Sequence, residues 1–206
     1  MQKKELIDSL KQKGFSEKII DAFERVHREK FVPEKLKPRA YEDTALPIGE
    51  GQTISQPYTI AMMLSLLELR KSQKVLEIGS GCGYVLALLS ELVGESGRVF
   101  GIEIIKELTE RSRNNLRSYK NIKVLKRNGA EGLEEEKPLD KILISAALEK
   151  IPEKLPEQLK NQGILVAPVG DSYIQSLVKF QKISNKLIVK EEIPGFVFVR
   201  FQNPNI

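Results

Sequence analysis

The feature that most constrains this fold is a regular alternation of short apolar runs with helix-like segments through the middle of the chain. The apolar runs are rich in β-branched residues and are predicted as strands at residues 74–78, 98–103, 122–126, 140–145 and 163–169. Strands that alternate with helices form parallel sheets joined by right-handed crossovers. The pattern therefore predicts a doubly wound α/β fold.

The segments before and after this region have a different character. Residues 2–13 and 17–28 are predicted as two short helices, and Ser16 stands where it could cap the second one. Residues 31–57 are rich in proline without a helical period, which predicts a long ordered loop or a short hairpin. Near the other end, the β-like runs at 176–183 and 186–193 flank a two-residue turn and predict an antiparallel hairpin, followed by a final strand in GFVFVRF.

A glycine-rich loop, EIGSGCGY, lies between the first predicted strand and the helix that follows it. Gly79, Gly81 and Gly83 allow the backbone to turn tightly and to approach a ligand closely. The spacing departs from the dinucleotide fingerprint because Tyr84 stands where its third glycine would be, and the lysine of a phosphate-binding P-loop is missing. The loop alone is weak evidence for any one ligand.

Polar residues at the ends of the next strands narrow the choice. Glu103 ends the second strand, where a carboxylate can accept hydrogen bonds from both hydroxyls of a ribose. Asn128 and Gly129 follow the third strand at the same edge of the sheet, which is the usual ligand crevice of open α/β sheets. Glu103 alone could equally be a solvated strand end, but beside the glycine loop it indicates a nucleoside site.

Histidine and cysteine are too scarce for several kinds of active site. The chain has one histidine, His27, and one cysteine, Cys82. A histidine-based triad or a multi-histidine metal site is therefore not expected, and no metal is predicted. Methyl transfer to a carboxylate needs neither, because a carboxyl group with a pKa of about 3.9 is already an ionised nucleophile at neutral pH. Cys82 is interpreted as a small turn residue, and the lack of a second cysteine favours the cytoplasm.

The chain resembles, almost end to end, the protein-L-isoaspartate (D-aspartate) O-methyltransferase family. The resemblance begins at REKFVPE (28–34), is most specific at AYEDTALPIGEGQTISQP (40–57), and continues through VLEIGSGCGY (75–84) to LVAPVG (165–170). It implies a Rossmann-like class I methyltransferase fold: a seven-stranded, mostly parallel sheet with a C-terminal antiparallel hairpin and an N-terminal helical addition. Members of this family methylate L-isoaspartyl carboxylates of damaged proteins with S-adenosyl-L-methionine, which initiates repair, and D-aspartyl carboxylates are a further candidate acceptor.

The resemblance also implies roles for individual residues. Ser55 would hold the acceptor carboxylate through its hydroxyl group and is the catalytic candidate. The substrate would contact Thr53, Ile54 and Ser55, together with Val199 and Arg200 near the end of the chain. The methyl donor would lie against residues of three loops: Glu77, Gly79, Ser80, Gly81 and Gly83 for its methionine part, Glu103 for the ribose, and Asn128 with Gly129 for the adenine.

Three positions depart from the family pattern. Asn128 stands where an aspartate is usual, so it can accept a hydrogen bond but carries no charge. The sequence SAALEK (145–150) replaces a run such as TAAAP after the fourth strand. Arg200 replaces a proline in the segment expected to line the peptide site, which makes substrate preference the least determined property.

Simpler interpretations stand beside these roles. Ser55 could cap the helix that begins near Pro57, since serine is a favoured capping residue. His27 is interpreted as structural, because the family often has proline at its position. The acceptor could instead be another protein, an RNA or a small molecule, and a non-catalytic basic binding module is a further alternative.

The chain has 206 residues and a net charge of +5, and these two values lead to expectations about its domains and partners. We expect one domain, 1–206, with N-terminal helices and a substrate loop in 1–57, a nucleoside-binding core in 58–170 and C-terminal strands in 171–206. The basic residues are interleaved with acidic ones, which favours a solvated surface over a nucleic-acid footprint. The partners are then damaged proteins or peptides rather than nucleic acid or membrane, and a monomer is expected.

Overall fold

The protein was analysed as a computed structural model, which describes residues 2–171 and 173–202. Its main sheet has seven strands in the order β5-β4-β3-β6-β7-β8-β9. The strands from β5 to β7 in this order are parallel to one another, β8 is antiparallel to β7, and β9 is antiparallel to β8. The strands are β3 (Lys74–Ile78), β4 (Arg98–Glu103), β5 (Ile122–Lys126), β6 (Leu139–Ile144), β7 (Leu159–Gly170), β8 (Gln175–Ile183) and β9 (Lys186–Phe196). The predicted fold, a mostly parallel sheet with a C-terminal antiparallel hairpin, is confirmed.

The central strands begin and end where the sequence pattern predicts. The bounds of β3, β4 and β5 agree with the prediction to the residue, because each is a short apolar run bounded by polar or glycine residues. Strand β7 is longer than predicted and starts at Leu159, since Leu159 pairs with Leu139 before the register shifts. Polar residues at 160–162 had concealed this extension from the apolar pattern.

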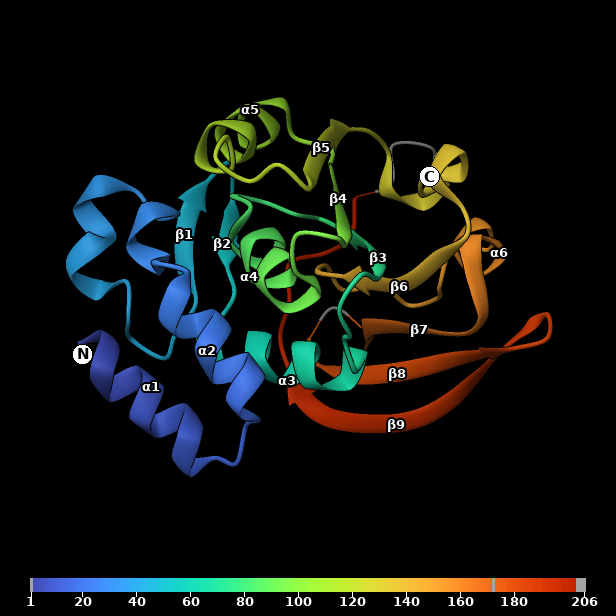
Figure 1. Ribbon diagram of the computed structural model, residues 1–206, viewed down its shortest axis with the longest axis horizontal. Coiled ribbons are helices and arrows are strands. Elements are labelled where there is room, and N and C mark those ends of the chain that lie inside the picture. Colours follow the sequence, from blue (N-terminus) through green and yellow to red (C-terminus); the bar gives the residue numbers. More distant parts are fainter. Residues whose placement is uncertain (1, 172, 203–206) are drawn as a thin grey trace.

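The sheet separates two hydrophobic cores. Successive side chains of a strand point to opposite faces, so Val75 of β3 joins one core and Leu76 joins the other. Figure 1 shows α3 and α4 in front of the sheet. The first face is covered by α3 (Pro57–Leu67), α4 (Tyr84–Val93) and α5 (Lys106–Asn115). On the second face, Leu155 of α6 (Lys154–Gln158) joins the core, as does Leu133 between the short helices η3 (Gly129–Glu131) and η4 (Glu134–Glu136).

The N-terminal segment adds helices and a small hairpin beside the sheet (Figure 1). Its elements are α1 (Lys3–Gln12), α2 (Glu17–Arg25), η1 (Arg28–Lys30), η2 (Glu34–Arg39), β1 (Leu46–Gly49) and β2 (Gln52–Ile54). The two predicted helices and the predicted short hairpin are confirmed. Ser16 occupies the capping position of α2, as predicted, but its side chain makes no capping hydrogen bond. Its carbonyl oxygen accepts from the Ile19 and Ile20 N–H groups.

The chain leaves the sheet after β9 and turns back toward the carboxyl ends of the parallel strands. The predicted hairpin of β8 and β9 is confirmed, but the predicted final strand through 195–201 is wrong. Pro194 has no N–H to donate and Gly195 adopts a φ of +97°, so the pairing with β8 ends at Phe196. Beyond it only Arg200 forms a single bridge, with Ala147.

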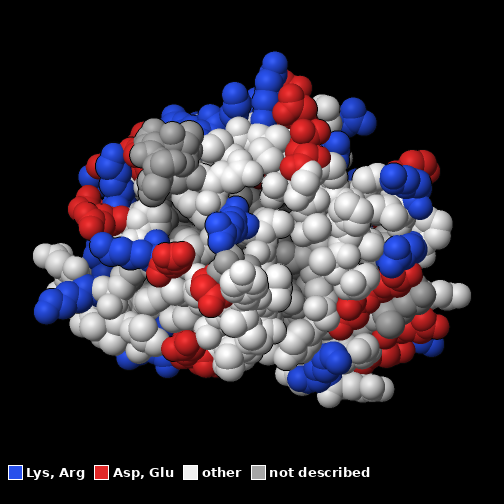
Figure 2. All heavy atoms as spheres, turned by 180° about the vertical axis from the view of Figure 1, so that it is seen from behind, with Lys and Arg blue, Asp and Glu red and all other residues white. Residues whose placement is uncertain are grey.

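Strand β9 is an edge of the sheet and most of its side chains are exposed. On the face of the molecule in Figure 2, Lys and Arg side chains lie among Asp and Glu, and the middle of that face carries few charges. Within residues 2–171 and 173–202, no helix is both long and apolar enough to span a lipid bilayer.

Candidate functional site

A pocket of about 560 Å³, open solvent included, lies at the carboxyl edge of the parallel strands. Ile78 and Glu103, at the ends of β3 and β4, form part of its wall. The N-terminal hairpin contributes Gln52 and Thr53, and residues 199–202 close another side. The fold therefore brings three distant parts of the chain together at the edge where open α/β sheets bind ligands.

The glycine loop forms one wall of this pocket through Gly79 and Gly81. Both have positive φ, +79° and +52°, a conformation that residues with a Cβ rarely adopt. A Cβ on Gly81 would lie 3.2 Å from Cδ1 of Ile48. Gly83 stands at the start of α4, and a Cβ there would lie 2.5 Å from Oγ of Ser112 on α5. The small size of Gly83 therefore permits α4 to pack against α5.

Glu103 ties the glycine loop to the next loop while it lines the pocket. Its Oε2 accepts a hydrogen bond from the Gly81 N–H at 2.8 Å, and its Oε1 accepts from the Ile105 N–H at 2.9 Å. The side chain is 5 % exposed. An ionised carboxylate offers about four lone-pair sites, so each oxygen keeps one for a ligand.

Gly129 and Asn128 lie at the start of η3 and differ in their relation to the pocket. Gly129 lines it, and a Cβ there would lie 2.3 Å from Cγ2 of Ile78, so no larger residue fits. The side chain of Asn128 caps η3 by accepting a hydrogen bond from the Ala130 N–H at 3.0 Å. Asn128 therefore shapes the loop that presents Gly129.

Glu77 lies behind the pocket wall, where it is 1 % exposed. Its Oε1 accepts a hydrogen bond at 2.8 Å from the hydroxyl of Ser145, a residue that lines the pocket. Burial, together with the negative charge of Glu103, raises the pKa of Glu77 to about 8 against the opposing effect of that hydrogen bond. Because this pKa lies above neutral pH, Glu77 holds its proton there, and Glu103 is the acidic residue that lines the pocket.

The raised pKa of Glu77 predicts how stability depends on pH. The folded state holds a proton that the unfolded state loses near pH 4.3, so between about pH 5 and pH 8 the free energy of unfolding falls as pH rises. This group contributes about 1 kcal/mol per pH unit within that window. We expect Glu77→Gln to remove this slope, as measured by urea unfolding from about pH 5 to pH 9. A variant with the wild-type slope would contradict the assignment.

Ser80 is a second buried polar residue of the glycine loop. Its side chain is 5 % exposed, and its hydroxyl oxygen has no hydrogen-bond partner among the described residues. Ser80 does not line the pocket. A Cβ on Gly101 of β4 would lie 3.1 Å from the Ser80 hydroxyl oxygen, so this group lies toward the strand behind the loop.

The predicted substrate residues come from two segments that meet at the pocket. Thr53, Val199 and Arg200 line it, whereas Ile54 is buried in the hydrophobic core. Ser55 follows β2 and is half-buried outside the pocket wall itself.

The helix that follows Ser55 is held by a different residue. The Asp43 carboxylate accepts a hydrogen bond from the Tyr58 N–H at 2.8 Å in the first turn of α3. The first turn of α3 thus has a side-chain acceptor other than Ser55.

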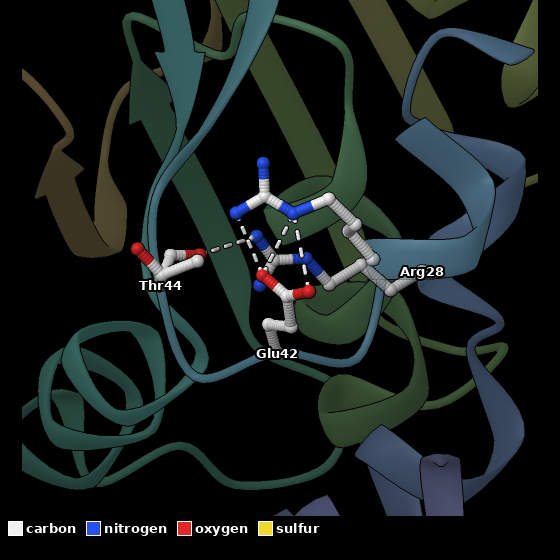
Figure 3. A network of polar contacts seen from close by, with 4 residues as sticks. Arg28, Glu42 and Thr44 are labelled. Atoms are coloured by element: carbon white, nitrogen blue, oxygen red, sulfur yellow. Dashed lines mark hydrogen bonds and ion pairs between the residues drawn. The ribbon is translucent and has the colours of Figure 1, made fainter. Parts of the chain in front are cut away.

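Sequence reasoning missed a buried arginine under this region. Arg28 is 0 % exposed and donates a hydrogen bond at 3.2 Å to the carbonyl oxygen of Thr44 (Figure 3). Its guanidinium lies 5.8 Å from the ring centroid of Tyr84, the first residue of α4. Burial lowers the pKa of Arg28. Arg28 thus fixes the N-terminal segment against the helix that follows the glycine loop.

Other pocket residues were also missed, and most had a signal in the sequence. Ser145 follows β6 at the edge where Glu103 ends β4, so the rule used for Glu103 could have found it. Gln52 lies in the same short segment as Thr53. Phe201 had no signal, because its place depends on the single bridge between Arg200 and Ala147.

The described residues contain no cluster of histidine, cysteine, aspartate and glutamate that could hold a metal ion. Cys82 is buried, and burial raises its pKa to about 11, so it remains a thiol at neutral pH. The polar groups that line the pocket are the Glu103 carboxylate, the Thr53 and Ser145 hydroxyls, the Gln52 and Gln202 amides and the Arg200 guanidinium.

Comparison with known proteins identifies the family. The model of the family described as protein-L-isoaspartate (D-aspartate) O-methyltransferase matches residues 1–204. A protein-L-isoaspartate O-methyltransferase of Methanothrix thermoacetophila is 48 % identical over 97 % of this chain and 94 % of its own length. Another from Fervidobacterium nodosum is 46 % identical over 96 % of this chain and its full length.

Solved structures agree with these relatives. A protein-L-isoaspartate O-methyltransferase superimposes with a TM-score of 0.91 at 29 % identity, covering 98 % of this chain and 66 % of that chain. A Plasmodium falciparum protein described by the same activity, in complex with S-adenosyl-L-homocysteine, gives a TM-score of 0.86 at 26 % identity and covers 98 % of this chain and 99 % of its own. The chain therefore belongs to the protein-L-isoaspartate (D-aspartate) O-methyltransferase family.

Proposed function

We propose that this protein transfers a methyl group from S-adenosyl-L-methionine to the free carboxylate of L-isoaspartyl residues in damaged proteins, as the first step of their repair. The observation that carries the proposal is the shared pocket. Thr53 of the predicted substrate loop lines the same cavity as Gly81 and Glu103 of the predicted nucleoside site. Donor and acceptor can therefore meet in one place.

The pocket fits the donor chemically. Gly79 and Gly81 leave a wall without side chains, and the two remaining lone-pair sites of Glu103 match the two hydroxyl groups of a ribose. Gly129 would face the adenine. S-adenosyl-L-methionine supplies an electrophilic methyl group on a positively charged sulfur.

The other candidate residues of the donor site support this wall from behind. Ser80 contributes a hydroxyl group without a partner among the described residues, and Glu77 orients the hydroxyl of Ser145. Gly83 positions α4 against α5, and Asn128 positions the loop that carries Gly129. We assign these four residues to positioning rather than to contact with the reacting atoms.

The acceptor needs alignment rather than activation. Its carboxylate is ionised at neutral pH and can attack without a general base. A hydrogen bond from the Ser55 hydroxyl, with Thr53 and Ile54 shaping the loop and Val199 and Arg200 opposite, would hold the acceptor in place. The apolar residues of the wall exclude water, which would otherwise solvate the carboxylate and weaken its attack.

We expect Ser55→Ala to lower turnover about 10- to 100-fold while the affinity for the donor stays within about twofold, since a hydrogen bond to a charged group contributes about 1.5–3 kcal/mol. Initial rates with an isoaspartyl peptide and calorimetric titration with the donor measure the two quantities. Asp43→Ala is the matched control: it removes the acceptor at the first turn of α3 and should lower the melting temperature instead. The capping position of α3 is Gln56, so the alternative that Ser55 caps this helix is wrong. A Ser55→Ala variant that loses melting temperature but keeps its turnover would show that Ser55 has only a structural role in the loop.

The proposed acceptor is tested with matched peptides. The protein is incubated with methyl-labelled donor and peptides of one sequence that carry an isoaspartyl, a normal aspartyl or a D-aspartyl residue. We expect base-labile methyl ester on the isoaspartyl peptide and none on the normal aspartyl peptide. Label on the normal peptide, or on RNA offered in a separate reaction, would indicate a different acceptor, and absence of calorimetric donor binding would indicate a binding module.

The remaining expectations belong to the same proposal. A monomer is expected to elute at a light-scattering mass near 23.3 kDa. The division into a substrate loop (1–57), a nucleoside-binding core (58–170) and C-terminal strands (171–206) predicts that proteolysis yields no independently folded half. A cytoplasmic location is supported by the single, buried Cys82.

A further inference from the structure

Arg200 lies between the pocket and a neighbouring groove. It lines the pocket together with Thr53, and it also lines a groove of about 1370 Å³, open solvent included, that is formed by residues 147–153 with Gly170 and Asp171. Its side chain is exposed. Its backbone is held in place, because the Phe201 N–H donates to the Ala147 carbonyl oxygen and the Ala147 N–H donates to that of Val199, both at 2.8 Å.

The charge of Arg200 is not neutralised by its surroundings. Within the described part of the chain, no hydrogen bond or ion pair involves its guanidinium, and no other Lys or Arg lines the pocket. Glu103, the acid of the pocket wall, already accepts two backbone N–H groups. A lone guanidinium at the mouth of a pocket that admits an anionic acceptor is available for a ligand.

The other charges of the groove are engaged or lie apart from the pocket. Lys150 pairs with Glu153 at 3.2 Å. The Asp171 carboxylate accepts hydrogen bonds from the backbone N–H groups of Tyr173 and Ile174, at 2.7 and 3.0 Å. Glu149 lines the groove but not the pocket. Arg200 is therefore the charge that a substrate chain would meet first as it leaves the pocket for the groove.

We propose that Arg200 is a specificity-determining residue that binds the side-chain carboxylate of an aspartate or glutamate flanking the isoaspartyl residue. This inference rests on the proposed function and deepens it. The planar guanidinium matches a carboxylate in a two-pronged hydrogen bond. A flanking carboxylate fits better than the acceptor itself, because Arg200 faces the groove as well as the pocket, and direct pairing would weaken the acceptor as a nucleophile.

The test compares isoaspartyl peptides that differ at one flanking position, which carries Glu, Gln or Lys either before or after the isoaspartyl residue. For the unaltered protein we expect kcat/KM to be about 2- to 5-fold higher with Glu than with Gln on one side, the upper part of the range of an exposed ion pair. The ratio should fall to about one in Arg200→Gln. In Arg200→Glu the order should reverse, with Lys preferred. Raising the ionic strength should also lower the ratio.

Lys150→Gln is the matched control, because it removes a cation of the groove that lies outside the pocket. A loss of the Glu preference in Lys150→Gln as large as in Arg200→Gln would overturn the proposal in favour of a general charge effect. Equal rates with Glu and Gln peptides for the unaltered protein would also overturn it. A third result would overturn the proposal: in Arg200→Gln, the calorimetric affinity for the donor falls by the same factor as kcat/KM, and this factor is the same for every peptide. Arg200 would then bind the donor. Failure of the proposed function is distinct, because the Gln peptide would then not be methylated at all.

Discussion

Gly81→Val is expected to abolish donor binding, with a Kd for S-adenosyl-L-methionine at least about 100-fold higher than that of the unaltered protein. Two effects act together. Gly81 has a φ of +52°, which costs a β-branched residue roughly 1–2 kcal/mol. In addition, the new side chain would stand at the pocket wall, 3.2 Å from Ile48 at its first carbon, in the space that the donor requires. Calorimetric titration measures the loss.

A matched control separates strain from occlusion. Gly14 also has a positive φ, +82°, but a Cβ there meets nothing within 4 Å and the residue lies outside the pocket. Gly14→Val should therefore lower the melting temperature and leave the donor Kd unchanged. Donor binding that survives Gly81→Val in a folded protein would refute the placement of the donor against this loop.

Glu103→Ala is expected to raise the donor Kd by about 100-fold or more and to destabilise the fold by a few kcal/mol. The donor loses two charge-assisted hydrogen bonds, each contributing about 1.5–3 kcal/mol. The fold loses the acceptor of the Gly81 and Ile105 N–H groups, and an unsatisfied buried donor costs about 1–3 kcal/mol. Titration and urea unfolding measure the two effects separately.

Glu107→Ala provides the comparison, since Glu107 is an exposed carboxylate four residues away on α5. It should change neither the donor Kd nor the catalytic rate. Glu103→Gln keeps the shape of the side chain, but its amide N–H₂ group would oppose one of the two backbone N–H groups. If Glu103→Ala bound the donor normally, the carboxylate would have only its structural role between the two loops.

The core of this fold could be predicted from sequence because its strands are local apolar patterns. β3 and β4 are buried on both faces, so their sequences are almost continuously apolar up to their last residues, Ile78 and Glu103. The edge where parallel strands end is also fixed by topology, and Gly81, Glu103 and Gly129 line one pocket at that edge.

The parts that sequence could not predict depend on contacts between distant segments. The small size of Gly83 is required by Ser112 on another helix, which no local pattern reveals. Glu77 belongs to the same motif as Gly79, yet strand alternation turns its side chain behind the pocket wall. Val199 and Arg200 were predicted only through the family resemblance, because no local pattern shows that the chain leaves the sheet after Phe196 and reaches the pocket.

The exposed edge strand β9 has a consequence for an enzyme that handles damaged chains. An open sheet edge is a template on which an unfolded polypeptide can add a further strand and begin to aggregate. Along this edge the chain places exposed Lys190, Glu191 and Glu192, followed by Pro194, which cannot donate a hydrogen bond. These residues disfavour such pairing along this part of the edge, so an unfolded polypeptide is less readily added to the sheet there.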